Sequence, residues 1–97
     1  MPLGILFVWD RRKAAANVGK HDVSFEEAAQ IFGDPLLLTV PDPEHSEREE
    51  RFFSIGQSWA HRLIAVSHQE SRNKIRIISA RKATRREARR YAEGEVD

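Results

Sequence analysis

The order of apolar and polar positions in the first quarter of the chain predicts one strand followed by one helix. Ile5 to Trp9 form a short apolar run that is typical of a strand. Asp10 follows and offers a carboxylate oxygen that can cap a helix, whose interior from Arg12 to Val18 is rich in alanine. We expect this helix to end near Gly19 to Asp22.

A second helix is predicted by its start and stop signals. Ser24 and Glu27 have the spacing of a capping box, in which each side chain bonds the backbone amide of the other residue. The helix should continue through Phe32. Gly33 can adopt the left-handed conformation that ends a helix, and Pro35 cannot continue one.

The remaining pattern predicts an antiparallel meander and a closing helix. A strand at Leu36 to Val40 should end at Pro41 to Pro43, because proline lacks the amide that continued pairing needs. Three more strands are expected, at Arg51 to Trp59, Arg62 to His68 and Lys74 to Ala80. Thr84 and Glu87 form a second capping box and place the last helix at Arg85 to Ala92.

These elements predict an α+β fold with an antiparallel sheet of about four strands plus an N-terminal strand, two N-terminal helices and one C-terminal helix. A length of 97 residues suits a single domain that spans residues 1–97. The sequence has no cysteine, which excludes disulfides and thiolate chemistry. The apolar runs are too short to cross a bilayer, so we expect a soluble, cytoplasmic protein.

Charge is distributed unevenly although the net charge is only +1. An acidic stretch in the middle of the chain contains Asp42, Glu44, Glu47, Glu49 and Glu50. The C-terminal quarter is basic and contains Arg76, Arg81, Lys82, Arg85, Arg86, Arg89 and Arg90. This polarity matters more than the net charge when the partner is a polyanion.

Several classes of chemistry lack their sequence signals. The four histidines have no zinc-binding spacing, and the chain contains neither a glycine-rich phosphate loop nor a serine elbow. We therefore expect no metal and no cofactor. The histidines, lysines, arginines, glutamates and the tyrosine are sufficient for metal-free RNA cleavage, which needs a base, an acid and cations that stabilise the charged transition state.

Each of these residues also has a simpler interpretation. His68 lies at the end of a predicted strand, where a hydrogen-bonded structural histidine is more common than a catalytic one. A basic helix is most often a solvated surface, and Glu87 is placed to pair with Arg90 or Tyr91 one turn later. Arg76 alternates with Ile75 and Ile77, so it should share the opposite face with Ile78 and Ala80. A charge within a strand is either paired or functional.

Five segments in the same order resemble the BrnT toxins of bacterial type II toxin-antitoxin modules: WDRRKAAAN (residues 9–17), KHDVSFEEAAQIFGDP (20–35), DPEHSEREERF (42–52), HRLIAVSH (61–68) and IRIISARKATRREARRY (75–91). The resemblance implies a RelE-like ribonuclease fold and an RNA substrate. It also implies neutralisation by a BrnA-like antitoxin, a ribbon-helix-helix protein that itself binds operator DNA.

In the wider RelE-like fold, basic residues on the sheet face and the last helix cleave RNA without a metal. Carried over by position, the resemblance implies a candidate catalytic set of Arg76, Arg81, His68, Arg62, His45 and Glu50. The candidate RNA-binding set is Lys82, Arg85, Arg86, Arg89, Tyr91 and Lys20. We expect Arg76, Arg81 and Lys82 to converge on one phosphate while a histidine or glutamate takes the proton of the 2′-hydroxyl.

The chain departs from the family pattern at three positions. Glycine is usual where this chain has Asp22 and common where it has His61, and arginine is frequent at Ser71. Aspartate tolerates the left-handed region, so we expect the turn at Asp22 to persist. Two alternatives to an enzyme are a nucleic-acid-binding module without catalysis and a module that docks an acidic antitoxin.

Overall fold

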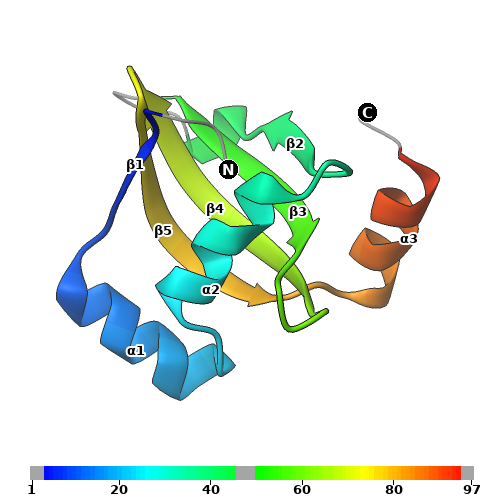
Figure 1. Cartoon of the computed structure of the whole chain (residues 1–97), viewed down its shortest axis with the longest axis horizontal. Helices are drawn as coiled ribbons and strands as arrows, with labels where there is room; N and C mark the ends of the chain where they lie inside the picture. Colours follow the sequence, from blue (N-terminus) through cyan, green and yellow to red (C-terminus); the bar gives the residue numbers. More distant parts are fainter. Residues whose placement is uncertain (1–3, 46–49, 95–97) are drawn as a thin grey trace.

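The computed structural model describes residues 4–45 and 50–94, which leaves Glu47 and Glu49 of the acidic stretch outside the described residues. The elements are β1 (Leu6–Val8), α1 (Arg11–His21), α2 (Phe25–Gln30), the 3-10 helix η1 (Ile31–Gly33), β2 (Leu38–Pro41), the 3-10 helix η2 (Pro43–His45), β3 (Arg51–Gln57), β4 (Leu63–Ser71), β5 (Lys74–Lys82) and α3 (Arg85–Glu93) (Figure 1). The predicted α+β architecture is confirmed.

The boundaries of α1 and α3 follow the predicted caps. The second helix differs, because α2 ends at Gln30 and continues as η1 to Gly33, which does not adopt the expected left-handed conformation. Asp10 accepts hydrogen bonds from two amides of the first turn of α1, and Asp22 ends that helix at a φ of 58°. Thr84 and Glu87 form a complete capping box at α3. At α2 the Ser24 hydroxyl accepts from the Glu27 amide as expected. The Glu27 carboxylate, however, accepts from distant side chains that are described below.

The five strands form one mixed sheet in the order β1-β5-β4-β3-β2. β1 runs parallel to β5, and every other pair is antiparallel. Pro41 was expected to follow the strand at Leu36 to Val40 and to stop its pairing, but it lies in β2 opposite Phe52. β2 is an edge strand, where a residue without an amide costs no pairing on the outer side.

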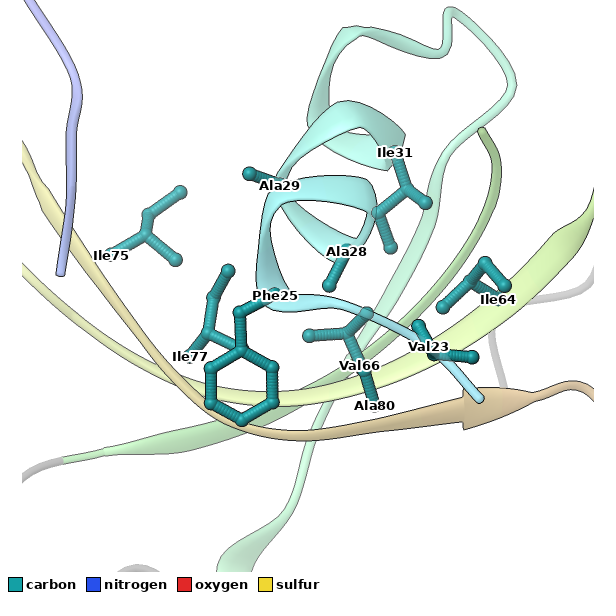
Figure 2. Close-up of a cluster of buried hydrophobic side chains, with 10 residues drawn as sticks. All are labelled: Val23, Phe25, Ala28, Ala29, Ile31, Ile64, Val66, Ile75, Ile77 and Ala80. Carbon is teal, nitrogen blue, oxygen red and sulfur yellow. The ribbon is translucent and has the colours of Figure 1, made fainter. Parts of the chain in front are cut away.

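Helices α1 and α2 cover one face of the sheet, which we call the covered face (Figure 1). The main core lies between this face and α2, and Figure 2 shows Phe25 of α2 among the isoleucines of β5. Its buried members are Val23, Phe25, Ala28, Ala29, Ile31, Ile64, Val66, Ile75, Ile77 and Ala80. Buried Asn17 joins α1 to the edge of β5, since its amide donates to the Ala80 oxygen at 2.8 Å and its oxygen accepts from the Ala80 amide at 3.2 Å.

The opposite face, which we call the open face, carries α3 against β3 at one end. Cross-strand pairs place the following side chains on it: Arg51, Phe53, Ser67, Gln69, Arg76, Ser79 and Arg81. Ala65 and Ile55 are buried on this face. The strand pairs also place Leu6, Val8, Leu38, Val40 and Leu63 on this face, so its polar and basic side chains lie among apolar ones.

A β-bulge interrupts β5 and reverses the alternation of its side chains. Ser67 pairs with Ser79 but the next residue, His68, pairs with Ile77, so Ile78 has no partner. We expected Ala80 to share a face with Arg76, and this prediction was wrong. The extra residue turns Ala80 into the covered core, where its exposed fraction is 1%, and brings Arg81 to the open face.

Candidate functional site

Arg76 lies on the open face in a groove at the end of the sheet where β1, β5 and β4 meet. It pairs with Val8 and Gln69, and its side chain is exposed. The groove has a volume of about 120 Å³ and is lined by Val8, Gln69, Ser71, Lys74 and Arg76. Within residues 4–45 and 50–94, no hydrogen bond or ion pair engages the Arg76 guanidinium; the Asp10 carboxylate is near enough to interact electrostatically. This groove therefore offers two cations to an anion.

Arg81 lies on the same face but its guanidinium is occupied. Its Nη1 and Nη2 atoms donate to the two carboxylate oxygens of Glu87 at 2.7 and 2.9 Å. The hydrogen bonds from Arg81 hold the pKa of Glu87 below its usual value, and the same contact raises the pKa of Arg81. The guanidinium also lies 5.8 Å from the centre of the Phe53 ring. Glu87 thus pairs with Arg81, and not with Arg90 or Tyr91 as expected.

The prediction that Arg76, Arg81 and Lys82 converge on one phosphate was wrong. The strand partners of Arg76 and Arg81, Gln69 and Ala65, lie four residues apart on β4, which corresponds to about 13 Å along the strand. Lys82 pairs with Ile64, a residue of the covered face, and interacts electrostatically with Glu27 there. The three cations are therefore distributed over two faces.

Arg62 holds the β3–β4 turn against the loop between α1 and α2. Its Nε donates to the Glu27 carboxylate at 2.9 Å, a second, shorter contact joins Nη2 to the same carboxylate, and Nη2 also donates to the Asp22 oxygen at 2.8 Å. The Ser58 hydroxyl donates to Glu27 at 2.8 Å. The hydrogen bond from Arg62 is the main reason that the pKa of Glu27 is lowered. This geometry gives Arg62 a structural task on the covered side.

His68 belongs to the covered face and is fully buried. Its ring packs edge-on against Phe32, with centroids 4.9 Å apart, and stacks on Phe52. Its Nε2 lies 2.7 Å from the Ser54 hydroxyl oxygen, and its Nδ1 lies 3.4 Å from a carboxylate oxygen of Glu70. Burial lowers the pKa of His68 to about 4. The ring is therefore neutral at pH 7.

Ser54, His68 and Glu70 have the order of a nucleophile, a base and an orienting acid. Nδ1 makes no hydrogen bond with the described residues, in spite of the nearby carboxylate, and either atom of the Ser54–Nε2 pair could be the donor. Ser54 and His68 both have an exposed fraction of 0%, however. No substrate reaches them in this conformation, and His68 lies on the opposite face from Arg76.

Tyr91 attaches α3 to the end of η1. Its hydroxyl donates to the Asp34 carboxylate at 2.6 Å, and burial, followed by this contact, raises the pKa of Tyr91 to about 12. Among the other predicted RNA-binding residues, Arg85, Arg86 and Arg89 are exposed on α3. Lys20 is exposed in the last turn of α1, within the helical layer.

The two remaining candidates precede β3, at the end of the sheet that carries Arg76. Glu50 is exposed and contributes to a raised pKa of Glu70, of which burial is the main cause. His45 ends η2, and its side chain lies outside what the structure describes.

Sequence reasoning did not identify Phe53 and Lys74 as members of this surface. Phe53 is half-buried on the open face beneath Arg81, and Lys74 lies in the groove with Arg76. Both could have been predicted from the sequence. Phe53 is two positions from Arg51 and Lys74 is two positions from Arg76, and residues two apart in a strand lie on the same face.

Within the described part of the chain, no group of three or more histidine, aspartate or glutamate side chains is arranged to hold a metal ion. Over the same residues, every helix is too short or too polar to cross a membrane.

Comparison with solved structures shows the fold. The crystal structure of the Brucella abortus ribonuclease toxin BrnT matches with a TM-score of 0.65 and 21% sequence identity, over 84% of this chain and 99% of that one. None of the curated proteins compared with the sequence matches it. The family model described as the ribonuclease toxin, BrnT, of type II toxin-antitoxin systems matches residues 9–87. As the resemblance of its motifs predicted, the chain belongs to the BrnT family of type II ribonuclease toxins.

Proposed function

We propose that this protein is a metal-independent endoribonuclease that binds RNA on the open face, acts in the cytoplasm and inhibits growth by cleaving RNA. The observation that carries the proposal is the groove of Arg76 and Lys74, in which the Arg76 guanidinium has no hydrogen-bonding partner among the described residues. An arginine can donate two parallel hydrogen bonds to a phosphate, which makes this groove the best place for the scissile phosphate.

In this mechanism the 2′-oxygen attacks the adjacent phosphorus and the bond to the 5′-oxygen breaks, which leaves a 2′,3′-cyclic phosphate. One group accepts the proton of the 2′-hydroxyl and another protonates the departing 5′-oxygen. Arg76 and Lys74 stabilise the additional negative charge on the phosphate oxygens in the transition state, the task that a metal performs in other nucleases. His45 and Glu50 remain the candidates for proton transfer, since His68 is buried and neutral.

The neighbouring residues of the open face suit the rest of the RNA. Phe53 presents a half-buried ring on which a base can stack, and Arg81 lies above that ring. The exposed arginines of α3, Arg85, Arg86 and Arg89, are available for phosphates along the strand. A BrnA-like ribbon-helix-helix antitoxin would neutralise the toxin by covering these cations, and operator DNA would be bound only through that antitoxin.

A non-catalytic RNA-binding or antitoxin-docking module is the second candidate. The pairing of Arg81 with Glu87 and the burial of His68 favour it, because both remove expected catalytic groups from the RNA surface. Such a module would bind RNA with a steep dependence on salt and leave the strand intact.

Cleavage of a labelled RNA in EDTA tests the proposal. Wild-type protein should yield products with a cyclic phosphate, and Arg76→Ala should reduce the rate by about 100-fold or more. Arg12→Ala is the matched control, because it removes an exposed arginine on α1, which packs on the covered side. Intact RNA after incubation with the wild type, or equal rates in the two variants, would count against the proposal. Growth arrest on expression, relieved by the antitoxin, tests the biological part.

A further inference from the structure

A second pocket lies at the other end of the sheet from Arg76. Its volume is about 270 Å³, and it lies between the end of the helical layer, at Gln30 and Pro35, and the β3–β4 turn, at Gln57, Trp59 and His61. This volume is slightly below the range of about 300 to 1,000 Å³ that drug-sized ligands occupy. The pocket therefore suits a single planar heterocycle.

Trp59 is the most exposed large apolar residue among those described, with an exposed fraction of 76%. By contrast, Trp9 is half-buried and packs edge-on against Phe25, with centroids 6.0 Å apart. The backbone that carries Trp59 is fixed, because its amide donates to the Gln30 side-chain oxygen at 3.0 Å. The fold therefore holds a large aromatic ring at the pocket without using it for packing, as in sites where a base stacks on an aromatic side chain.

Polar groups at the pocket match the edge of a base. The Gln30 side-chain oxygen accepts from the Trp59 amide, so the Gln30 amino group, with its two N–H donors, points away from that amide. On the other side, the Gln57 side-chain nitrogen lies 3.5 Å from His61 Nδ1, which leaves the Gln57 oxygen as an acceptor. A donor and an acceptor beside a stacking ring are the groups that read an unstacked base. His61 also has a φ of 61°, a conformation that is uncommon for a non-glycine residue.

The charge of the pocket favours a neutral group. Its one carboxylate, Asp34, is fully engaged: one oxygen accepts from the Leu36 amide at 2.8 Å, and the other accepts from the Gln57 amide at 2.8 Å and the Tyr91 hydroxyl at 2.6 Å. A phosphate or an acidic peptide would be repelled there. The contact with Tyr91 also places the basic helix α3 beside the pocket, so phosphates that flank a bound base would meet cations.

We propose that this pocket is a subsite for one unstacked nucleobase of the RNA, with Trp59 as its stacking surface. The subsite rests on the proposed function for the identity of its ligand and would contribute to sequence preference. Gln57 and Arg51, which mark the two ends of β3, are six residues apart, or about 20 Å. The bound base would therefore belong to a nucleotide several positions away from the scissile phosphate.

Binding of an RNA that cannot be cleaved tests the subsite. A fully 2′-O-methylated oligonucleotide lacks the attacking hydroxyl, and a Trp9→Phe variant leaves Trp59 as the only tryptophan. Titration should quench the fluorescence of Trp59. Should Trp9→Phe not fold, the difference in quenching between wild type and Trp59→Phe reports the same contact.

Affinity for a labelled form of this oligonucleotide, measured by anisotropy, should fall by about 5- to 150-fold in Trp59→Ala. Trp59→Phe, which keeps a ring, should lose less. Leu36→Ala is the matched control, because Leu36 is also exposed, at 69%, but does not line the pocket. Absence of quenching together with equal affinity in Trp59→Ala would overturn the subsite.

Two further outcomes separate this proposal from the others. If Trp59→Ala and Leu36→Ala both weaken the complex with the antitoxin and neither alters RNA affinity, the surface is a protein interface and the subsite is wrong. Quenching without any cleavage by the wild type would overturn the ribonuclease mechanism and leave the subsite standing. If Trp59→Ala cleaves RNA with the rate and the sequence preference of the wild type, the subsite is wrong and the ribonuclease mechanism stands.

Discussion

Arg76 and Arg81 share the open face of β5 because a bulge at Ile78 lies between them. Without that extra residue, side chains five positions apart would point to opposite faces. The two guanidinium groups thus belong to one surface but to different places on it: Arg76 lies in the groove with Lys74, and Arg81 is paired with Glu87 above Phe53.

The separation of these two arginines predicts that their contributions to RNA binding are independent. Residues more than about 7 to 10 Å apart without shared partners usually contribute additively, within about 0.5 kcal/mol. We expect the free-energy losses of Arg76→Ala and Arg81→Ala to sum to that of the double variant. A double-mutant cycle on RNA affinity measures this. A larger coupling would mean that both residues hold the same phosphate.

Local signals in the sequence were sufficient for the caps of α1 and α3 and for the left-handed turn at Asp22, but not for Gly33, whose φ is not positive. Asp10 and Thr84 cap helices as expected, and Asp22 and His61, at positions where the family favours glycine, both have a positive φ. A cap depends only on residues within one turn, and a positive φ on a single residue.

The functional surface depended on information that the sequence pattern does not contain. The bulge moved Ala80 and Arg81 to the faces opposite to those that strict alternation predicts. The partners of Arg62 and Arg81 are set by tertiary packing, which decides whether a cation is paired or free; Glu27, for example, is 35 residues from Arg62 in the sequence. Alternation alone identified Arg76 correctly as an exposed strand cation because no bulge precedes it in β5.

Release of Arg81 from Glu87 should strengthen RNA binding. Glu87→Gln removes a charge that now holds the guanidinium, so Arg81 becomes available for a phosphate and the dependence of log affinity on log salt should steepen by about 1. The same change should lower the free energy of unfolding by no more than about 1 kcal/mol, because the Arg81 side chain is 40% exposed. Glu93→Gln is the control, since it removes an equal charge from the same helix. Equal salt dependence in the two variants would contradict the prediction.

Arg62→Ala should reduce stability and leave the chemistry of cleavage intact. The substitution leaves the Glu27 carboxylate, whose side chain is 16% exposed, without its main partner. We expect a loss of about 1 to 3 kcal/mol in the free energy of unfolding, measured by urea denaturation. Arg72→Ala, in the exposed β4–β5 turn, should change it little. Native stability combined with lost cleavage would instead assign Arg62 to the catalytic set, as the resemblance implied.

Two glycines should respond to alanine in opposite ways. A Cβ atom at Gly56 would lie 2.8 Å from the Ile31 Cβ and 3.2 Å from the Ile31 oxygen, so β3 would have to move away from η1. We expect a loss of about 1 to 3 kcal/mol for Gly56→Ala. Gly19 lies within α1, and an added Cβ would have no atom within 4 Å apart from the neighbouring backbone of the helix itself, so its replacement should gain about 0.5 to 1 kcal/mol. Urea denaturation of both variants measures these changes in the free energy of unfolding. A change of the same sign and size in Gly56→Ala and Gly19→Ala would contradict the prediction.

The burial of His68 should make the protein less stable as the pH falls below neutrality. In the folded state the pKa is about 4, whereas an unfolded histidine has a pKa of about 6.5. Between these values the unfolded chain binds a proton that the folded protein does not. The stabilisation is therefore complete above pH 6.5 and is lost as the pH falls towards 4, by about 3 kcal/mol in total.

Urea denaturation from pH 7.5 to 5 should reveal this loss in the wild type, and His68→Gln should abolish most of the slope because its side chain does not titrate. Glu27, Asp34 and Glu87 should contribute little to this slope. The pKa of each is lowered, so these carboxylates titrate below the pH range of the experiment. Glu70 acts in the opposite direction because burial raises its pKa, so the comparison is repeated in a Glu70→Gln background. Identical slopes with and without His68 in both backgrounds would show that the ring becomes charged in the folded protein, and proton transfer by His68 would then become possible.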